Sequence, residues 1–241
     1  MFKTVDEAIH FIESQRAKRS FEDFQKIIER YQIPIDLKNV IHVAGTNGKG
    51  STVTFIKDLL MKQGYHVGTF TSPYIIKHHE RISVDGKPIS DDDLLRFINQ
   101  LLPLIQQEHL SMFEIDTLIM LYYFNELDLD YHIIECGIGG LHDKTNVIKS
   151  NVAVITNIGY DHQFMLGDTL LEIASHKVGI VKENVPLFTT EQNKEILSYF
   201  KDYCTKHQST FYPLQVEKQY QYPYHLHFIK KNMYYIYQHI K

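Results

Sequence analysis

The sequence has little of three features that would each point to a class of protein. Its two cysteines, Cys136 and Cys204, are too few for a disulfide framework or a zinc-binding pattern, and they suit a reducing compartment. The 25 Lys and Arg residues are outnumbered by 29 Asp and Glu residues, so no basic excess favours nucleic acid. No apolar run approaches the roughly 18 residues of a membrane helix. We therefore expect a cytoplasmic protein without nucleic-acid or membrane partners.

Short apolar runs alternate with amphipathic stretches along the 241 residues, which are ample for one α/β domain and few for two. The apolar runs predict strands at 40–44, 66–70, 82–84, 131–135 and 152–156. The amphipathic stretches predict helices at 5–15, 21–30, 50–63, 91–107, 112–126, 170–178 and 191–207. Ser111 and Glu114 have capping-box spacing, and 224–229 with 233–237 predicts a hairpin. The alternation predicts an α/β fold, with a mostly parallel sheet, helices on both faces, and ligands at the carboxyl ends of the strands.

A glycine-rich segment lies between the first predicted strand and the helix that follows it. It reads Ala44-Gly45-Thr46-Asn47-Gly48-Lys49-Gly50-Ser51-Thr52. Glycines let backbone N–H groups converge on phosphate oxygens, the helix N-terminus adds positive charge, and Lys49 would lie against the outer phosphates. Ser51 or Thr52 could offer a hydroxyl to Mg²⁺. The sequence therefore predicts a phosphate-binding loop (P-loop).

The general Walker pattern is not matched, because Gly50 separates Lys49 from Ser51 and Ala44 stands where that pattern has glycine. The alternative is a tight turn that caps a helix without a ligand. Glycines alone would favour that alternative. A lysine followed by Ser and Thr between a strand and a helix favours phosphate binding.

Further blocks follow in order along the chain. They are Thr71-Ser72-Pro73-Tyr74, Glu80-Arg81-Ile82, Glu135-Cys136-Gly137-Ile138-Gly139-Gly140, Asp143-Lys144-Thr145-Asn146, Ile155-Thr156-Asn157-Ile158-Gly159-Tyr160-Asp161-His162 and His176-Lys177-Val178-Gly179-Ile180. With the P-loop, these blocks resemble the N-terminal ATPase portion of the folylpolyglutamate synthase/dihydrofolate synthase family, in the Mur ligase superfamily. Three places depart from the family pattern: Tyr74 replaces a histidine, Leu141-His142 replaces Arg-Leu, and His176 replaces a glutamate.

The resemblance implies an ATP-dependent ligase of folate metabolism. Such an enzyme transfers the γ-phosphate of ATP to a pteroate or folate carboxylate, and the amine of L-glutamate attacks the resulting acyl phosphate. The protein mainly positions the reactants and neutralises charge. The implied small-molecule substrates are ATP, L-glutamate and either dihydropteroate or tetrahydrofolate(polyglutamate).

The resemblance also implies roles for single residues. The implied ATP-binding residues are Gly45, Thr46, Asn47, Gly48, Lys49, Gly50, Ser51 and Thr52. The implied catalytic residues are Lys49, Glu135, His162 and Lys177. Ser51, Glu135 and His162 would hold Mg²⁺, and Lys177 would be carbamylated, which turns its ammonium into an anionic metal ligand. From the residues alone, Glu135 could instead face water, His162 could be a surface or core residue, and Lys177 could pair with a carboxylate on a helix surface.

The segment around Ser72, Pro73 and Arg81 resembles the family's loop that shapes the folate pocket, which implies substrate contacts for these three residues. By composition alone, a charged hairpin would look the same. The blocks run from about residue 40 to residue 186. We therefore expect a single Mur-ligase-like ATP-binding domain over 1–241, with N-terminal helices at 1–38, a P-loop core at 39–186 and a divergent tail at 187–241.

Family members are longer than this chain, so the resemblance implies a truncated version that lacks the C-terminal Rossmann-like domain. Three alternatives stay open: a shortened ligase, a non-catalytic ATP/Mg²⁺-binding homologue that acts as a regulator or interaction partner, and a protein completed by a second chain. Cell-wall amino-acid ligases are the runner-up within the superfamily, and the Glu80-Arg81-Ile82 and Asp143-Lys144-Thr145-Asn146 blocks argue against them. An exposed sheet edge also predicts self-association.

Overall fold

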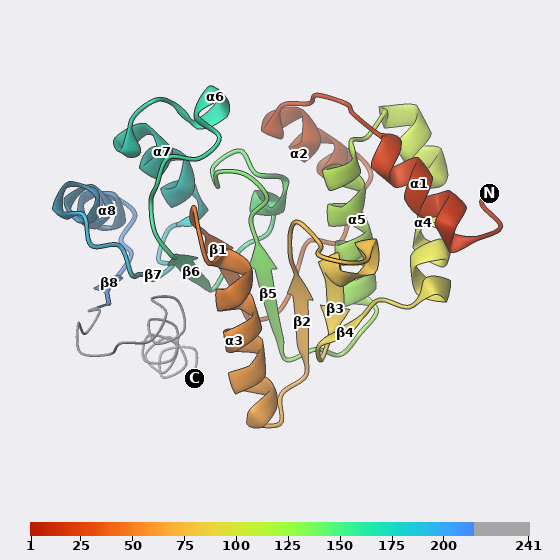
Figure 1. The fold of residues 1–241 in the computed structure, drawn as a ribbon, viewed down its shortest axis with the longest axis horizontal. Coiled ribbons are helices and arrows are strands. Elements are labelled where there is room, and N and C mark those ends of the chain that lie inside the picture. Colours follow the sequence, from red (N-terminus) through yellow and green to blue (C-terminus); the bar gives the residue numbers. More distant parts are fainter. Residues whose placement is uncertain (215–241) are drawn as a thin grey trace.

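An eight-stranded sheet forms the centre of the protein, in a computed structural model that describes residues 1–214 (Figure 1). The predicted hairpin at 224–229 and 233–237 lies outside these residues. The strand order is β4-β3-β2-β5-β1-β6-β7-β8. Neighbouring strands from β2 to β8 in this order run parallel, whereas β3 pairs antiparallel with both β2 and β4. The strands are β1 (Val40–Ala44), β2 (Val67–Phe70), β3 (Ile82–Val84), β4 (Lys87–Pro88), β5 (Tyr131–Glu135), β6 (Val152–Ile155), β7 (Leu187–Thr189) and β8 (Phe211–Pro213). The predicted α/β fold with a mostly parallel sheet is confirmed.

Helices connect the strands. The helices are α1 (Val5–Ser14), α2 (Phe21–Arg30), α3 (Lys49–Lys62), α4 (Asp91–Glu108), α5 (Met112–Asn125), α6 (Gln163–Leu166), α7 (Leu170–Lys177) and α8 (Lys194–Lys206), with 3-10 turns η1 (His78–Arg81), η2 (Lys144–Val147) and η3 (Val178–Ile180). The predicted capping box is confirmed, because the Ser111 hydroxyl accepts from Glu114 N–H and the Glu114 carboxylate accepts from Ser111 N–H. The short elements α6, β7 and β8 were not predicted.

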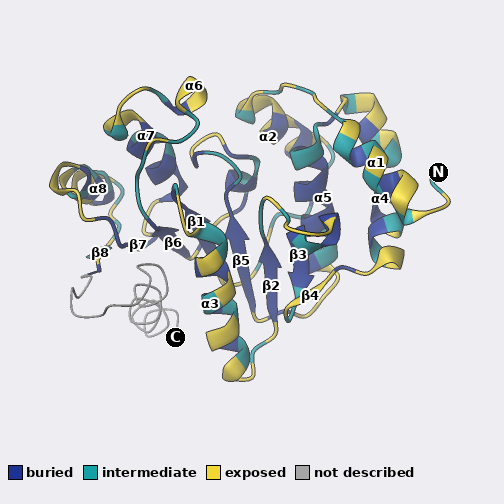
Figure 2. Cartoon of the chain, in the orientation of Figure 1, coloured by how far each residue is buried: buried dark blue, intermediate teal, exposed yellow. Residues whose placement is uncertain are grey.

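Side chains alternate between the two faces of the central strands, and this alternation places the helices. Val43 of β1 and Val154 of β6 pack in one cluster with Val53 and Ile56 of α3. Ala44, Ala153 and Ile155 point to the opposite face, where they pack with residues of α7, η3 and α8. The sheet is therefore covered on both faces, and Figure 2 shows the central strands buried while the outer side of α3 is exposed.

The N-terminal helices share a core with the sheet. Phe24 of α2 and Ile12 of α1 belong to the same buried cluster as Phe97 of α4, Leu118 of α5 and Ile134 of β5. At the other end of the described chain, β7 and β8 extend the sheet beyond residue 186, and α8 connects these two strands. Each flanking segment thus packs against or continues the central sheet. None of the helices in residues 1–214 is both long and apolar enough to span a membrane.

Candidate functional site

Several loops leave the parallel strands at one edge of the sheet. Val43 of β1 lies beside Glu135 at the end of β5, and Ala44 lies beside Ile155 at the end of β6. The segments that follow are the P-loop after β1, the glycine-rich block after β5 and the Asp161-His162 block after β6. Carboxyl ends of parallel strands are where open α/β sheets bind ligands, so the sequence blocks meet at the expected edge.

The P-loop has the backbone conformation that its glycines permit. Gly45 has φ +144° and Gly48 has φ +80°, and Gly48 caps α3 without any side-chain hydrogen bond to the first turn. The amides of that turn therefore point out of the helix N-terminus without a side-chain cap, as anion binding requires. The Thr52 hydroxyl donates to the Gly48 carbonyl at 2.8 Å, whereas Ser51 is exposed and makes no side-chain hydrogen bond within residues 1–214. This difference favours Ser51 over Thr52 as the hydroxyl available to a metal.

Residues after β6 brace the P-loop. Thr46 N–H donates to the Asn157 carbonyl at 2.9 Å, and the Thr156 hydroxyl donates to the Asn47 carbonyl at 2.7 Å. A Cβ added to Gly45 would lie 1.8 Å from the Thr156 hydroxyl oxygen. The two segments approach so closely that only glycine fits at this position.

Glu135 and Lys49 bring opposite charges to this edge. Lys49 Nζ lies 4.0 Å from Glu135 Oε1, and Ser72 N–H donates to Glu135 Oε2 at 3.3 Å. Burial raises the pKa of the Glu135 carboxyl to about 7, against the opposing effects of Lys49 and the Ser72 amide. A buried carboxylate whose one ion pair within residues 1–214 is 4.0 Å long fits a site for an added cation.

Lys177 reaches the P-loop from the end of α7. Its side chain is buried, and Nζ donates to the Gly45 carbonyl at 3.0 Å. Burial, together with the nearby positive charge of Lys49, lowers the pKa of the Lys177 amine to about 8. A neutral amine is the form that carbamylation requires, so the surroundings of Lys177 suit that modification.

His162 follows β6 in a left-handed conformation, with φ +47°, at the start of α6. Its Nε2 lies 3.3 Å from Asp161 Oδ1, which is its one ion pair in the described chain. No group of three or more His, Cys, Asp or Glu side chains within residues 1–214 could by itself hold a metal ion.

The Ser72, Pro73 and Arg81 segment lies beside Glu135 through the Ser72 amide, and a cis peptide bond joins Ser72 to Pro73. Arg81 is buried, and its Nε lies 3.5 Å from Asp116 Oδ2 of α5. Asp116 lies outside the sequence blocks that predict the site. A charged residue inside the apolar run of α5 was the available signal, because such a residue needs a buried partner.

The glycine-rich block after β5 is fastened to α7. Leu141 N–H donates to the His176 carbonyl at 2.7 Å, and a Cβ on Gly140 would lie 2.7 Å from the Lys177 carbonyl oxygen. Asp143 Oδ2 accepts from Ile138 N–H at 2.9 Å, which fixes the turn between them. His142 and His176, which both differ from the family pattern, are in contact, with their ring centroids 5.8 Å apart.

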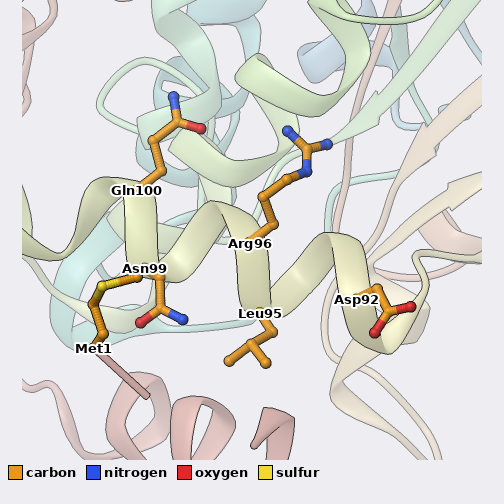
Figure 3. Close-up of a pocket in the computed structure, with 6 residues that line it drawn as sticks. All are labelled: Met1, Asp92, Leu95, Arg96, Asn99 and Gln100. Carbon is orange, nitrogen blue, oxygen red and sulfur yellow. The ribbon is translucent and has the colours of Figure 1, made fainter. Parts of the chain in front are cut away.

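A separate pocket lies on α4, away from these loops (Figure 3). It is lined by Met1, Asp92, Leu95, Arg96, Asn99 and Gln100. None of the residues predicted to act in the site lines it, so we do not assign it a part in that site.

Comparison with known proteins agrees with the placement of these blocks. The Mur ligase middle domain family matches residues 43–233. The dihydrofolate synthase/folylpolyglutamate synthase of Bacillus subtilis is 44% identical over 197 residues, which is 79% of this chain and 46% of the relative. The folylpolyglutamate synthase of Lacticaseibacillus casei is 42% identical over 156 residues, which is 62% of this chain and 36% of the relative.

Solved structures give the same result. A folylpolyglutamate synthase complex with AMPPCP and folate has a TM-score of 0.82 at 32% identity, covering 87% of this chain and 54% of that one. A bifunctional folylpolyglutamate synthase/dihydrofolate synthase with Mn, AMPPNP and L-glutamate bound has a TM-score of 0.75 at 27% identity, covering 88% and 52%. The chain spans about half the length of these relatives. It belongs to the Mur ligase family through its middle domain, within which its relatives are the folylpolyglutamate and dihydrofolate synthases.

Proposed function

We propose that this protein is an ATP-dependent ligase of folate metabolism that adds L-glutamate to dihydropteroate or tetrahydrofolate(polyglutamate) through an acyl phosphate. The observation that carries the proposal is the meeting of Lys49, Glu135 and the uncapped N-terminus of α3 at one sheet edge. The names of the relatives supply the substrate class, because their structures hold an ATP analogue with folate or with L-glutamate.

In this proposal, the P-loop binds the phosphates of ATP. The amides of the first turn of α3 and the Lys49 ammonium would face the outer phosphate oxygens. Glu135 and Ser51 would hold Mg²⁺, which when bound neutralises phosphate charge during transfer. Glu135 sits beside the Ser72 segment, so the acceptor carboxylate and the γ-phosphate could be brought together there.

His162 and Lys177 are proposed to complete the metal-binding side of the site. His162 lies at the start of α6, after the strand next to the P-loop strand. Lys177 is buried against the Gly45 carbonyl, and as a carbamate it would place negative charge behind the P-loop. Ser72, Pro73 and Arg81 are the proposed acceptor-side residues, and cytoplasm is the proposed location.

The test is an incubation of the chain with ATP, Mg²⁺, L-glutamate and either dihydropteroate or tetrahydrofolate. The proposal expects ADP and a glutamylated product. Magnesium-dependent ATP binding without product would instead favour the alternative, a non-catalytic ATP/Mg²⁺-binding homologue that acts as a regulator or interaction partner. Product formed only after a second cellular protein is added would favour completion by another chain.

A further inference from the structure

The loop at residues 71–81, which carries Ser72 and Arg81, is closed at its base. Thr71 N–H donates to the Arg81 carbonyl at 2.8 Å, and the Thr71 hydroxyl donates to the Glu80 carbonyl at 3.2 Å. Inside the loop, the Glu80 carboxylate accepts from the amides of Ile75, Ile76 and Lys77. These bonds make the loop a self-supporting unit, so its position depends on what fastens it to the rest of the protein.

His78 is the most buried of the points at which this loop is fastened; its neighbour His79 also reaches α4, with Nε2 3.0 Å from Asp91 Oδ1. Its Nε2 lies 2.8 Å from Asp116 Oδ1 on α5, and its Nδ1 lies 3.2 Å from Glu13 Oε1 on α1. The His78 side chain is 3% exposed and that of Asp116 1%. A single imidazole therefore joins the loop to two helices.

Two further loop residues reach the same carboxylates. The Tyr74 hydroxyl donates to Glu13 Oε1 at 2.6 Å, and Arg81 Nε lies 3.5 Å from Asp116 Oδ2. The Arg81 guanidinium also lies over the Tyr74 ring, 5.4 Å from its centroid. We call Glu13, Tyr74, His78, Arg81 and Asp116 the loop latch.

Asp116 is the member whose presence most needs an explanation. Ile115, Thr117 and Leu118, its neighbours on α5, are completely buried. A carboxylate in such surroundings is costly to desolvate unless it is paired and hydrogen-bonded. In the described part of the chain, its side-chain partners are His78 and Arg81, both from the loop. The loop thus offsets the buried carboxylate with a hydrogen bond from His78 to Oδ1 and an ion pair from Arg81 to Oδ2, which makes no hydrogen bond, and the carboxylate in turn holds the loop.

The latch connects to the metal side of the site through the backbone. Ser72 N–H, at the start of the loop, donates to Glu135 Oε2 at 3.3 Å. A loop free to move would take this donor away from Glu135. Partners that orient a metal-binding carboxylate commonly change metal affinity about 10- to 100-fold when removed.

We propose that His78 and Asp116 are positioning residues that hold the 71–81 loop, so that Ser72 stays on Glu135 and the acceptor side is preformed without ligand. The inference rests on the proposed function for the identity of the acceptor. The fastening of the loop is a property of the ligand-free chain.

Hydrogen exchange of the ligand-free full chain tests the fastening. In Asp116→Asn, which removes the charge at nearly constant shape, we expect amide exchange of segment 71–82 to rise about tenfold or more, with β1 and β5 unchanged. The double variant His78→Phe/Asp116→Leu replaces the buried pair with apolar side chains. It leaves the buried Arg81 without its Asp116 partner, so we expect a lower melting temperature. Faster exchange confined to segment 71–82, with β1 and β5 unchanged, separates loop release from general destabilisation.

Lys144→Met is the matched control. Lys144 Nζ lies 3.2 Å from Glu114 Oε1, a buried carboxylate on the same helix α5, and Lys144 makes no contact with the latch. We expect this variant to leave exchange of segment 71–82 unchanged. Equal exchange of that segment in wild type and Asp116→Asn, or an equal rise in Lys144→Met, would overturn the fastening.

Two calorimetric titrations test the positioning role. The first adds Mg²⁺ to the protein at a fixed ATP concentration, and the second adds ATP without Mg²⁺. We expect Asp116→Asn to weaken Mg²⁺ affinity about tenfold while metal-free nucleotide affinity stays unchanged. A purely structural role would weaken both, and that result, or unchanged Mg²⁺ affinity beside a released loop, would overturn the positioning role. Because the exchange experiment contains no ligand, failure of the wild type to form product would count against the proposed function alone.

Discussion

At the scale of single residues, the site contains two ionisable side chains, Glu135 and Lys177, whose charged forms are disfavoured by burial. Glu135 has a raised pKa and Lys177 a lowered one, and burial is the main cause for both. Shifts of this kind cluster at functional sites because the same low-dielectric surroundings strengthen interactions with a bound charge. Lys49, with its side chain 16% exposed, is the cation that we propose an entering phosphate meets.

Lys49→Met should weaken ATP binding while the fold is kept. A hydrogen bond from a charged donor contributes about 1.5–3 kcal/mol, so we expect a loss of roughly 10- to 100-fold in affinity. Calorimetry measures the affinity, and circular dichroism checks the fold. Lys57→Met, which removes a half-buried lysine of α3 that pairs with Asp58 at 3.0 Å, is the control expected to bind ATP normally. Normal ATP affinity in Lys49→Met would contradict its proposed role.

Glu135→Gln should stabilise the ligand-free protein above pH 7. The folded pKa of about 7 lies above the ordinary 4.5. Ionisation of the carboxyl therefore destabilises the fold increasingly as pH rises from 4.5 to 7, and the destabilisation is complete above pH 7. The effect is on the order of 3 kcal/mol. We expect a higher melting temperature for the variant at pH 8 and little difference at pH 4.5. A lower melting temperature at pH 8 would show that the carboxylate is not disfavoured.

His78 should titrate at higher pH than an ordinary histidine. Burial disfavours its charged form, but hydrogen bonds and charges from Asp116 and Glu13 outweigh burial and raise the pKa of His78, with Arg81 opposing. Because the folded pKa is above the unfolded 6.5, the stabilisation is complete below pH 6.5 and is lost as pH rises through the folded value. NMR of the imidazole should show this, and Asp116→Asn should lower the midpoint. An unchanged midpoint would contradict the coupling.

At the scale of elements, the P-loop depends on the segment after β6 as much as on its own glycines. Gly45→Ala would place a Cβ against the Thr156 hydroxyl, whereas a Cβ on Gly48 would meet nothing within 4 Å. Both positions have positive φ, which costs about 1–2 kcal/mol for a residue with a side chain. We expect Gly48→Ala to lose about that much stability and Gly45→Ala clearly more, because overpacking adds to it. Denaturant unfolding of the two variants measures the difference, and equal losses would contradict the close packing.

The sequence patterns predicted the helices and strands better than they predicted the contacts between them. The strands 40–44, 82–84 and 131–135 were predicted with the bounds that the structure has, because apolar runs flanked by turn residues mark buried strands. The four-residue α6 and the three-residue β7 and β8 were not predicted, since such short segments complete too little of a period. The edge at which Lys49 and Glu135 meet followed from the parallel topology.

The loop latch could not be predicted in this way. Glu13 and His78 are 65 residues apart, and His78 and Asp116 are 38 residues apart. Neither spacing belongs to a motif, and only tertiary packing of α1 and α5 beside the loop brings the three together. Local patterns fix an element, whereas a contact between distant elements depends on the whole fold.

At the scale of the whole molecule, the β4 edge of the sheet is protected against pairing with another chain. β4 at one edge has only two residues, Lys87 and Pro88, both exposed. Short strands that carry lysine and proline pair poorly with another chain. Self-association, if it occurs, should therefore not use this edge.

Light scattering of the chain at increasing concentration measures the assembly. Self-association remains our proposal, and we expect the mass to rise above that of the 28.3 kDa monomer. A charge reversal at β4, Lys87→Glu, should leave the mass unchanged because that edge is not used. A constant monomer mass at high concentration would contradict self-association.

We propose that the loops at the carboxyl ends of the parallel strands bind ATP together with magnesium. Titration of the wild-type chain with ATP, with and without Mg²⁺, tests it directly, and Glu135→Gln is the matched variant. We expect Mg²⁺ to strengthen ATP binding to the wild type and this Mg²⁺ effect to be lost in Glu135→Gln. A wild type that does not bind ATP, or binds it equally with and without Mg²⁺, would rule out this site.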